Sequence, residues 1–260
     1  MPDRPTALIT GASGGLGAEF AQIHAARGGD LILVARSADK LAALQAQLHE
    51  QHGVRVTVIA RDLAETDACE RLVEEIRGQG LAVDYLLNNA GFGGAGEFVS
   101  RPWADDRQMI LLNVLTLSGL TRLLLPEMLA RGSGRVLNVG SLASFLPGPL
   151  QATYYATKAY VLSLSEALAN EVSGTGVTVT CLCPGPTKTG FADRADAGDT
   201  RAFRRAAAAA DVARYGYDAM LAGKRVAVHG WKNKLLIHGL LRLMPRRLVT
   251  QISRMTMEKP

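Results

Sequence analysis

Short apolar runs alternate along this chain with longer segments whose apolar residues recur at helical spacing. We expect strands at Thr6–Thr10, Leu31–Ala35, Val54–Ala60, Val83–Leu87, Arg135–Val139, Val177–Leu182 and Arg225–His229. We expect helices at Gly15–Gly28, Ala38–Gln51, Thr66–Arg77, Asp105–Arg131, Ala152–Val172 and Asp211–Leu221. The strand runs are apolar almost throughout, which is typical of a parallel sheet buried on both faces. The alternation therefore predicts an α/β fold with a doubly wound parallel sheet in three α/β/α layers.

Length and composition favour a single domain. The chain has 260 residues, of which 48% are hydrophobic and 20% charged, so it can bury a full core. Neither an internal repeat nor a linker interrupts it. We expect one catalytic domain over residues 1–230, with a mobile lid at 190–210, followed by a basic, apolar tail over 231–260 that belongs to the same domain. Within the lid, the alanine-rich stretch Arg201–Ala210 is expected to be a surface helix.

Several classes of protein are disfavoured by the sequence. The three cysteines, Cys69, Cys181 and Cys183, are too few for a disulfide framework. The C-x-C pair reads as two small strand residues, because no second pair is placed to complete a zinc site, and no metal ion is expected. Met1–Pro5 is short and polar, so we expect no signal peptide. We also expect no apolar stretch near the roughly 20 residues that span a bilayer, and hence a cytoplasmic protein.

A glycine-rich turn follows the first strand. It reads Thr10-Gly11-Ala12-Ser13-Gly14-Gly15-Leu16-Gly17, and its glycines allow the backbone to turn sharply and to approach a ligand. The next helix directs its free N–H groups at this turn, where they favour a pyrophosphate. The spacing differs from G-x-G-x-x-G, and no Gly-Lys-Ser/Thr follows. A dinucleotide site of Rossmann type is indicated, although a bare strand–helix connection would also fit.

The end of the second strand predicts which dinucleotide is bound. An acidic residue there would favour NAD by binding ribose hydroxyls, but the strand ends Val34-Ala35-Arg36. A guanidinium can hold a ribose 2′-phosphate through two hydrogen bonds, and Lys40 lies one turn further on. We therefore expect NADP(H). The alternative is that Arg36 is only a solvated surface arginine.

Polar residues close two further strands and begin a helix. Asn88–Gly91 and Asn138–Ser141 follow strands whose carboxyl ends should face a ligand. Tyr154 and Lys158 lie four residues apart and share one helix face. A nearby ammonium lowers the pKa of a tyrosine, which is otherwise about 10, and so suits it to acid–base catalysis. Tyr154 is thus the expected acid/base, with Ser141 holding the substrate oxygen beside it.

Taken together, these motifs resemble those of the short-chain dehydrogenase/reductase family over roughly Thr6 to Thr189. The matches are T-G-x-x-x-G-x-G at Thr10–Gly17, N-N-A-G at Asn88–Gly91, the serine at Ser141, Y-x-x-x-K at Tyr154–Lys158, and P-G at Pro184-Gly185. One departure is Gly140, where the family often has serine. Because the catalytic serine is the next residue, we expect little consequence.

The resemblance implies a role for each matched residue. Tyr154 would be the acid/base, Ser141 would orient the carbonyl, and Lys158 would bind the nicotinamide ribose and lower the tyrosine pKa. Asn113 would support a water-linked proton relay through the lysine. The expected cofactor-binding set, with Arg36 added from the second strand, is Thr10, Gly11, Ser13, Gly15, Leu16, Gly17, Arg36, Asp62, Leu63, Asn89, Ala90, Gly91, Tyr154, Lys158, Pro184, Gly185, Thr187 and Thr189.

Loops give the only sequence signal for the substrate. The expected walls are Phe92–Gly94, Leu142–Leu150 and the segment after Gly190. The second is apolar with proline bends, which favours a hydrophobic ketone, aldehyde or 3-oxoacyl-type substrate over a sugar. The expected function is hydride transfer between NADP(H) and a carbonyl or secondary alcohol. A non-catalytic NADP-binding sensor is the main alternative, and an epimerase or dehydratase is a lesser one.

The net charge of +5 resides in the tail. After Met220 there are nine basic residues and one acidic residue, Glu258, which leaves residues 1–220 slightly acidic. The apolar run Leu235–Met244 is followed by Pro245-Arg246-Arg247. The tail is expected to cover the substrate cleft or a subunit interface of a homo-oligomer, a dimer or tetramer. The alternative is an interfacial anchor giving weak peripheral contact with anionic lipid. No recognition module supports nucleic acid as a partner.

Overall fold

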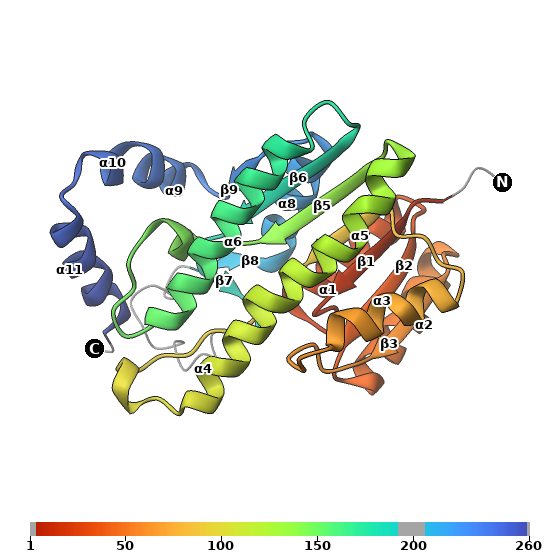
Figure 1. The fold of residues 1–260 in the computed structure, drawn as a ribbon, viewed down its shortest axis with the longest axis horizontal. Coiled ribbons are helices and arrows are strands. Elements are labelled where there is room, and N and C mark those ends of the chain that lie inside the picture. Colours follow the sequence, from red (N-terminus) through yellow and green to blue (C-terminus); the bar gives the residue numbers. More distant parts are fainter. Residues whose placement is uncertain (1–3, 192–205, 259–260) are drawn as a thin grey trace.

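A seven-stranded parallel sheet forms the centre of the computed structural model, which describes residues 4–191 and 206–258 (Figure 1). The strand order is β3-β2-β1-β4-β5-β6-β9, so the sheet is doubly wound as predicted. The strands are β1 (Thr6–Thr10), β2 (Asp30–Ala35), β3 (Val56–Ala60), β4 (Tyr85–Asn88), β5 (Gly134–Val139), β6 (Val177–Cys183) and β9 (Val226–Val228). The order reverses between β1 and β4, and ligands bind at such a switch point in open α/β sheets.

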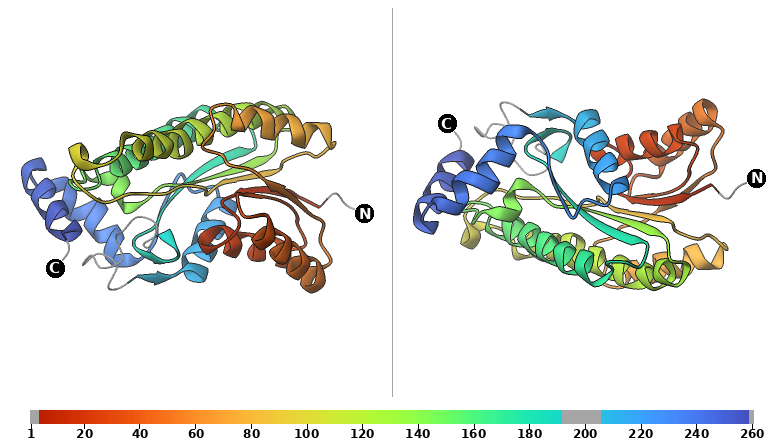
Figure 2. Two further views of the ribbon diagram at one scale, coloured as in Figure 1. Left: turned by 90° about the horizontal axis from the view of Figure 1, so that it is seen from below. Right: turned by 90° about the horizontal axis from the view of Figure 1, so that it is seen from above.

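Helices cover both faces of the sheet, as the two edge-on views in Figure 2 show. One layer holds α1 (Gly15–Ala26), α2 (Ala38–His52) and α8 (Ala209–Leu221). The opposite layer holds α3 (Ala68–Gly78), α4 (Trp103–Ile110), α5 (Leu117–Arg131) and α6 (Ala152–Glu171). The predicted three-layer Rossmann-type architecture is therefore confirmed.

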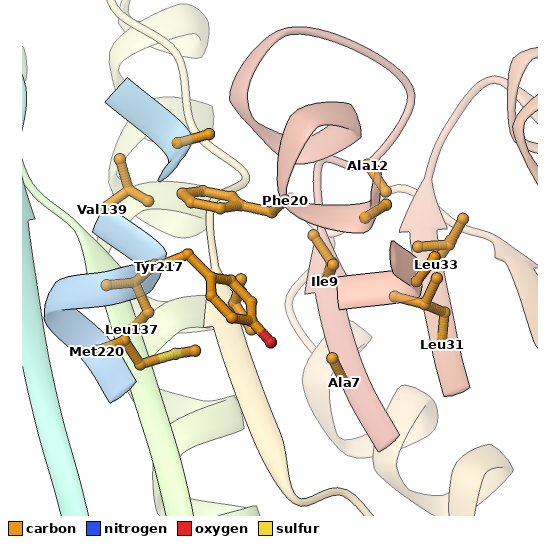
Figure 3. Packing of buried hydrophobic residues seen from close by; sticks show 14 of the residues in the cluster. Ala7, Ile9, Ala12, Phe20, Leu31, Leu33, Leu137, Val139, Tyr217 and Met220 are labelled. Carbon is orange, nitrogen blue, oxygen red and sulfur yellow. The ribbon is translucent and has the colours of Figure 1, made fainter. Parts of the chain in front are cut away.

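Two buried clusters, one on each face of the sheet, explain why the strands are apolar without alternation. Successive side chains of a strand point to opposite faces. On β1, Ile9 packs beneath α1 and α8, whereas Leu8 packs on the other face. Figure 3 shows Phe20 of α1 and Tyr217 of α8 beside the side chains of the first face. Both clusters are buried, so the central strands β1 and β2 need apolar residues almost throughout.

The helix expected at Asp105–Arg131 differs in detail from the prediction. It begins at Trp103, and a π-helical segment, Leu111–Thr116, separates α4 from α5. Such segments are frequent at functional sites, and this one carries Asn113. The whole helix, Trp103–Arg131, is long and apolar enough to span a membrane by length and composition, so the expectation that no stretch approaches that length was wrong. Its inner residues, Leu120 and Leu124 among them, pack in the core.

The expected surface helix at Arg201–Ala210 was also wrong in the part that the structure describes. Ala207–Ala208 form a short strand, β8, which pairs with β7 (Thr187–Lys188), and α8 begins only at Ala209. Composition alone favoured a helix, but backbone pairing with β7 sets the conformation here. Residues 192–205, which include most of the predicted lid, lie outside the described residues.

The tail forms a chain of short helices beyond the carboxyl ends of the strands (Figure 1, blue). These are α9 (Trp231–Leu235), a π-helical turn (Leu236–Leu240), α10 (Leu241–Leu243) and α11 (Arg246–Met257). Pro245 precedes α11, and its missing N–H suits the start of a helix. The tail therefore lies next to the carboxyl-terminal edge of the sheet, which is the edge at which ligands bind.

Candidate active site

A cleft of about 890 Å³ follows the carboxyl ends of the strands from β2 to the tail. All the predicted cofactor residues line it except Thr10 and Gly17, and of the predicted catalytic residues only Asn113 does not. The cleft has two halves. Residues after β1, β2, β3 and β4 line the nucleotide half, and residues from η3 (the 3₁₀ helix Leu142–Phe145), α6 and the tail line the substrate half.

Three glycines of the turn at the nucleotide half, Gly11, Gly15 and Gly17, leave little or no room for a side chain. Gly11 and Gly15 have φ of 67° and 54°, a region that favours glycine. A Cβ on Gly17 would lie 2.2 Å from the Gly11 carbonyl oxygen. Beyond the turn, the N-terminus of α1 faces the cleft through Gly15 and Leu16. This bare, N–H-rich surface fits a pyrophosphate.

Thr10 and Asn89 hold the ends of β1 and β4 together. The Thr10 hydroxyl accepts hydrogen bonds from the backbone N–H groups of Asn89 and Ala90, both at 3.0 Å. In return, the Asn89 side-chain amide donates to the Thr10 carbonyl at 2.9 Å. Thr10 therefore shapes the cofactor turn from behind, while Asn89 and Ala90 reach the cleft itself.

Basic side chains gather where the adenosine ribose of a dinucleotide would lie. Arg36 is more than half exposed, and its guanidinium is 3.9 Å from the Asp62 carboxylate. Such an exposed pair is weak and leaves the guanidinium free to bind a phosphate. Ser37, Lys40 and Arg61 line the same end of the cleft. Our sequence analysis missed Ser37 and Arg61, although their positions beside the ends of β2 and β3 could have indicated them.

Three of the predicted catalytic side chains lie between the two halves of the cleft: Ser141, Tyr154 and Lys158. Tyr154 and Lys158 are buried on α6, and Ser141 directly follows β5 and Gly140. The Lys158 ammonium donates to the Val139 carbonyl at 2.7 Å and lies 5.9 Å from the centre of the Tyr154 ring. Burial lowers the pKa of Lys158 to about 8. The lysine therefore remains largely protonated at neutral pH.

The pKa of Tyr154 departs from the expectation. Burial raises it well above its ordinary value, and the facing Ser141 hydroxyl only partly opposes that rise. The predicted lowering by Lys158 is not seen in this structure, where the pKa of Tyr154 rises on burial and the Lys158 ammonium donates to the Val139 carbonyl. A raised pKa keeps the phenol protonated at neutral pH, so Tyr154 has a proton to give before any carbonyl is reduced.

A reciprocal pair of hydrogen bonds fixes Ser141. Its hydroxyl accepts from the Ala143 N–H at 3.1 Å, and the Ser144 hydroxyl accepts from the Ser141 N–H at 3.2 Å. Close packing explains why residue 140 is a glycine, since a Cβ on Gly140 would lie 2.9 Å from the Cys181 sulfur. Cys181 and Cys183 are buried strand residues, as expected, and their sulfurs are 3.7 Å apart.

Asn113 acts behind the site rather than in it. Its side chain is buried and pairs with both backbone groups of Phe92, accepting from the N–H at 3.2 Å and donating to the carbonyl at 2.9 Å. It also donates to the Thr157 hydroxyl at 3.1 Å. Asn113 thereby joins the π-helical segment to α6 and to the loop after β4. The proton-relay role that the family resemblance implies for it stays a prediction.

Apolar side chains enclose the substrate half. The predicted walls contribute Phe92, Leu142, Ala143, Leu146 and Phe191. Phe191 packs against Tyr154 with ring centres 5.3 Å apart. The tail contributes residues that the sequence analysis did not assign, namely Leu236, Leu240, Leu241, Met244, Val249, Ile252, Ser253, Thr256 and Met257. The tail thus lines the substrate cleft, as one of the two readings of its sequence predicted.

Tyr155 belongs to this half. Its ring stands edge-on to that of Tyr154, 6.1 Å away at 79°. It packs over Gly148, where a Cβ would lie 2.1 Å from the ring. Burial raises the pKa of Tyr155, and the Ser253 hydroxyl of α11 opposes that rise. The two adjacent tyrosines therefore differ in position: Tyr154 lies at the reaction centre, and Tyr155 forms part of the wall of the substrate half.

Comparison with known proteins agrees with this geometry. The family model described as "short chain dehydrogenase" matches residues 5–200. "Ketoacyl reductase HetN" of Nostoc is 35% identical over 184 residues, covering 69% of this chain and 62% of that protein. "Very-long-chain 3-oxoacyl-CoA reductase" of Pyrenophora tritici-repentis is 37% identical over 185 residues, covering 68% and 53%. A solved short-chain dehydrogenase from Sphingobium yanoikuyae in complex with NADPH has a TM-score of 0.81 at 31% identity, covering 93% and 97%. The chain spans less than two thirds of either curated relative's length.

Proposed function

This chain belongs to the short-chain dehydrogenase/reductase family, and we propose that it transfers a hydride between NADP(H) and the carbonyl of a hydrophobic ketone, aldehyde or 3-oxoacyl-type substrate. The observation that carries the proposal is the position of Tyr154. It lies between a bare glycine turn that fits a pyrophosphate and an apolar chamber that fits an acyl chain.

The side chains at the centre of the cleft have distinct tasks in this reaction. The bound cofactor supplies or accepts the hydride. The Ser141 hydroxyl, held by its backbone contacts, orients the carbonyl oxygen. Tyr154 gives its phenolic proton to that oxygen as negative charge develops, and its raised pKa means that the phenol carries this proton at neutral pH. The Lys158 ammonium, fixed by the Val139 carbonyl, adds positive charge beside the phenol.

The preference for NADP(H) rests on the basic end of the nucleotide half. Arg36, Lys40 and Arg61 line it. Arg61 is paired with Glu75 at 2.6 Å, whereas among the described residues the guanidinium of Arg36 faces only the exposed Asp62 carboxylate. Replacing Arg36 with alanine should weaken NADPH binding about tenfold or more, because charge-assisted hydrogen bonds contribute roughly 1.5–3 kcal/mol. NADH binding should change little. Equal losses for both cofactors, measured by titrating protein fluorescence, would contradict the assignment.

The substrate class rests on the apolar chamber and on the names of the two relatives. The test is a panel of 3-oxoacyl thioesters, bulky ketones and polar sugars, each assayed with NADPH and with NADH. We expect turnover of the first two groups with NADPH. Turnover of sugars alone would contradict the substrate class, and NADPH binding without turnover of any carbonyl would favour the sensor alternative. That alternative is weakened by the presence of both Tyr154 and Lys158.

The proposal also includes the localisation and the oligomeric state of the protein. We infer a cytoplasmic homo-oligomer. An exposed apolar face around α4 and α5, with Phe98, Val99, Trp103 and Leu115, offers a surface for a second copy. Sedimentation velocity on the wild-type chain tests this, since a monomer at micromolar concentration would contradict it.

A further inference from the structure

The tail, residues 231–258, has two chemically different faces. Its inner side chains, Val249 and Met257 among them, line the substrate chamber. Its outer face carries large apolar side chains that are exposed to solvent and do not line the chamber: Trp231, Leu235, Leu243, Leu248 and Met255. Leu243 is 86% exposed and Trp231 69%. A run of exposed apolar residues on short helices marks a binding surface.

The tail also carries an excess of positive charge. Lys232, Lys234, Arg246, Arg247 and Arg254 are all exposed, and Lys232 lies over the Trp231 ring at 5.5 Å. The single acidic residue of the tail, Glu258, is paired with Arg254 at 3.1 Å. Basic residues beside exposed Trp and Leu are the composition that binds an anionic lipid interface.

The other exposed apolar face of the molecule shows the contrast. Around Phe98, Val99 and Trp103 the exposed charges include Glu97 and Asp105 and give no positive excess. That face is suited to a second copy of the chain. Two copies of the tail would bring like charges together, which costs energy, so its charge fits an anionic partner better.

We propose that the outer face of the tail docks on anionic lipid bilayers. The same helices would then present their inner face to the chamber, so that an acyl substrate could pass from the bilayer to Tyr154 without crossing water. The docking step depends only on the outer face. The delivery step rests on the proposed function, and only that step fails if the substrate class is wrong.

Lipid binding can be measured without any substrate, by co-sedimentation with vesicles of phosphatidylcholine alone or mixed with phosphatidylserine. We expect binding to the mixed vesicles at low salt, little binding to pure phosphatidylcholine, and loss of binding as salt rises. Reversing two charges, in Arg246→Glu/Arg247→Glu, should weaken binding at least about tenfold. Leu243→Ser should weaken it several-fold.

Matched controls come from elsewhere on the surface. Val99→Ser removes an apolar side chain that is 88% exposed, against 86% for Leu243. Arg107→Glu reverses an exposed charge on α4. Both should leave lipid binding unchanged, and all variants should bind NADPH like the wild type. No binding of wild type to the mixed vesicles at low salt would overturn the proposal, as would equal losses in the controls. A dimer that Leu243→Ser separates, without lipid binding, would assign the face to a subunit contact instead.

Discussion

The two halves of the cleft are built in opposite ways. In the nucleotide half, backbone groups and short side chains are fixed by hydrogen bonds, as between Thr10 and Asn89. In the substrate half, helices carry large apolar side chains such as Leu146, Met244 and Ile252, whose contacts have no strict direction. The first half demands particular residues at particular places. The second demands only volume and polarity, so it can change without disturbing the chemistry.

The adjacent tyrosines give the largest expected effect. Tyr154→Phe removes the proton donor, and the turnover number should fall by about 10² to 10⁴, because general acid catalysis contributes that much. Binding of NADPH should persist. Tyr155→Phe is the matched control in the wall of the chamber, and it should alter KM rather than the turnover number. Similar losses of turnover in both variants would contradict the assignment of Tyr154 to proton donation and of Tyr155 to the wall of the chamber.

A methyl group in the glycine turn should produce the next largest effect. Gly17→Ala would place a Cβ 2.2 Å from the Gly11 carbonyl oxygen and 2.7 Å from the Asn89 amide, so the turn must move. We expect NADPH affinity to fall at least about tenfold, since overpacking costs roughly 1–3 kcal/mol. Gly78→Ala, outside the cleft, is the control, because no described residue lies within 4 Å of its Cβ position. Isothermal titration with NADPH should separate the two, and equal affinities would contradict this account.

The pH dependence of reduction tests the protonation states of Lys158 and Tyr154, which lie between the two halves of the cleft. Burial lowers the pKa of Lys158 to about 8, so its ammonium is lost as pH rises through that value. Tyr154 has a raised pKa and stays protonated. The kcat/KM for reduction should therefore be level below pH 8 and fall about tenfold per unit above it. A rate that climbs above pH 8 would mean that the phenolate, not the phenol, is the active form.

A substitution in the chamber should give the smallest and most selective effect. Val249→Trp fills space on the inner face of α11. We expect kcat/KM for a long-chain 3-oxoacyl thioester to fall about tenfold, while a small ketone is reduced almost as before. Leu248→Trp is the control on the exposed outer face of the same helix. If chain length makes no difference to the Val249 variant, the tail does not form the substrate wall.

This contrast also explains what could be predicted from the sequence. The sheet and its helices followed from apolar periodicity, with small shifts at their ends. In the nucleotide half, a steric requirement leaves a signature in residue type, as at Gly11 and Gly15. Thr10 and Gly17 were also found by motif, although they support the turn without lining the cleft.

The substrate half could not be predicted in the same way. Met244 and Ile252 reach the chamber only because the tail folds back over the strand ends, and their sequence spacing from Tyr154 gives no hint of that contact. The raised pKa of Tyr154 was missed for a related reason. It depends on burial beneath neighbours such as Phe191, whereas the motif shows only the charge of Lys158.

The central claim is that a hydride passes from NADPH to a carbonyl carbon beside Tyr154. The most direct measurement uses NADPH carrying deuterium at both positions of the nicotinamide C4, a medium-chain 3-oxoacyl thioester, and mass spectrometry of the product. We predict one deuterium on the carbon that bears the new hydroxyl group in the wild type, and about 10² to 10⁴ times less labelled product from Tyr154→Phe over the same time. An unlabelled product, or equal labelling by the two proteins, would contradict the account.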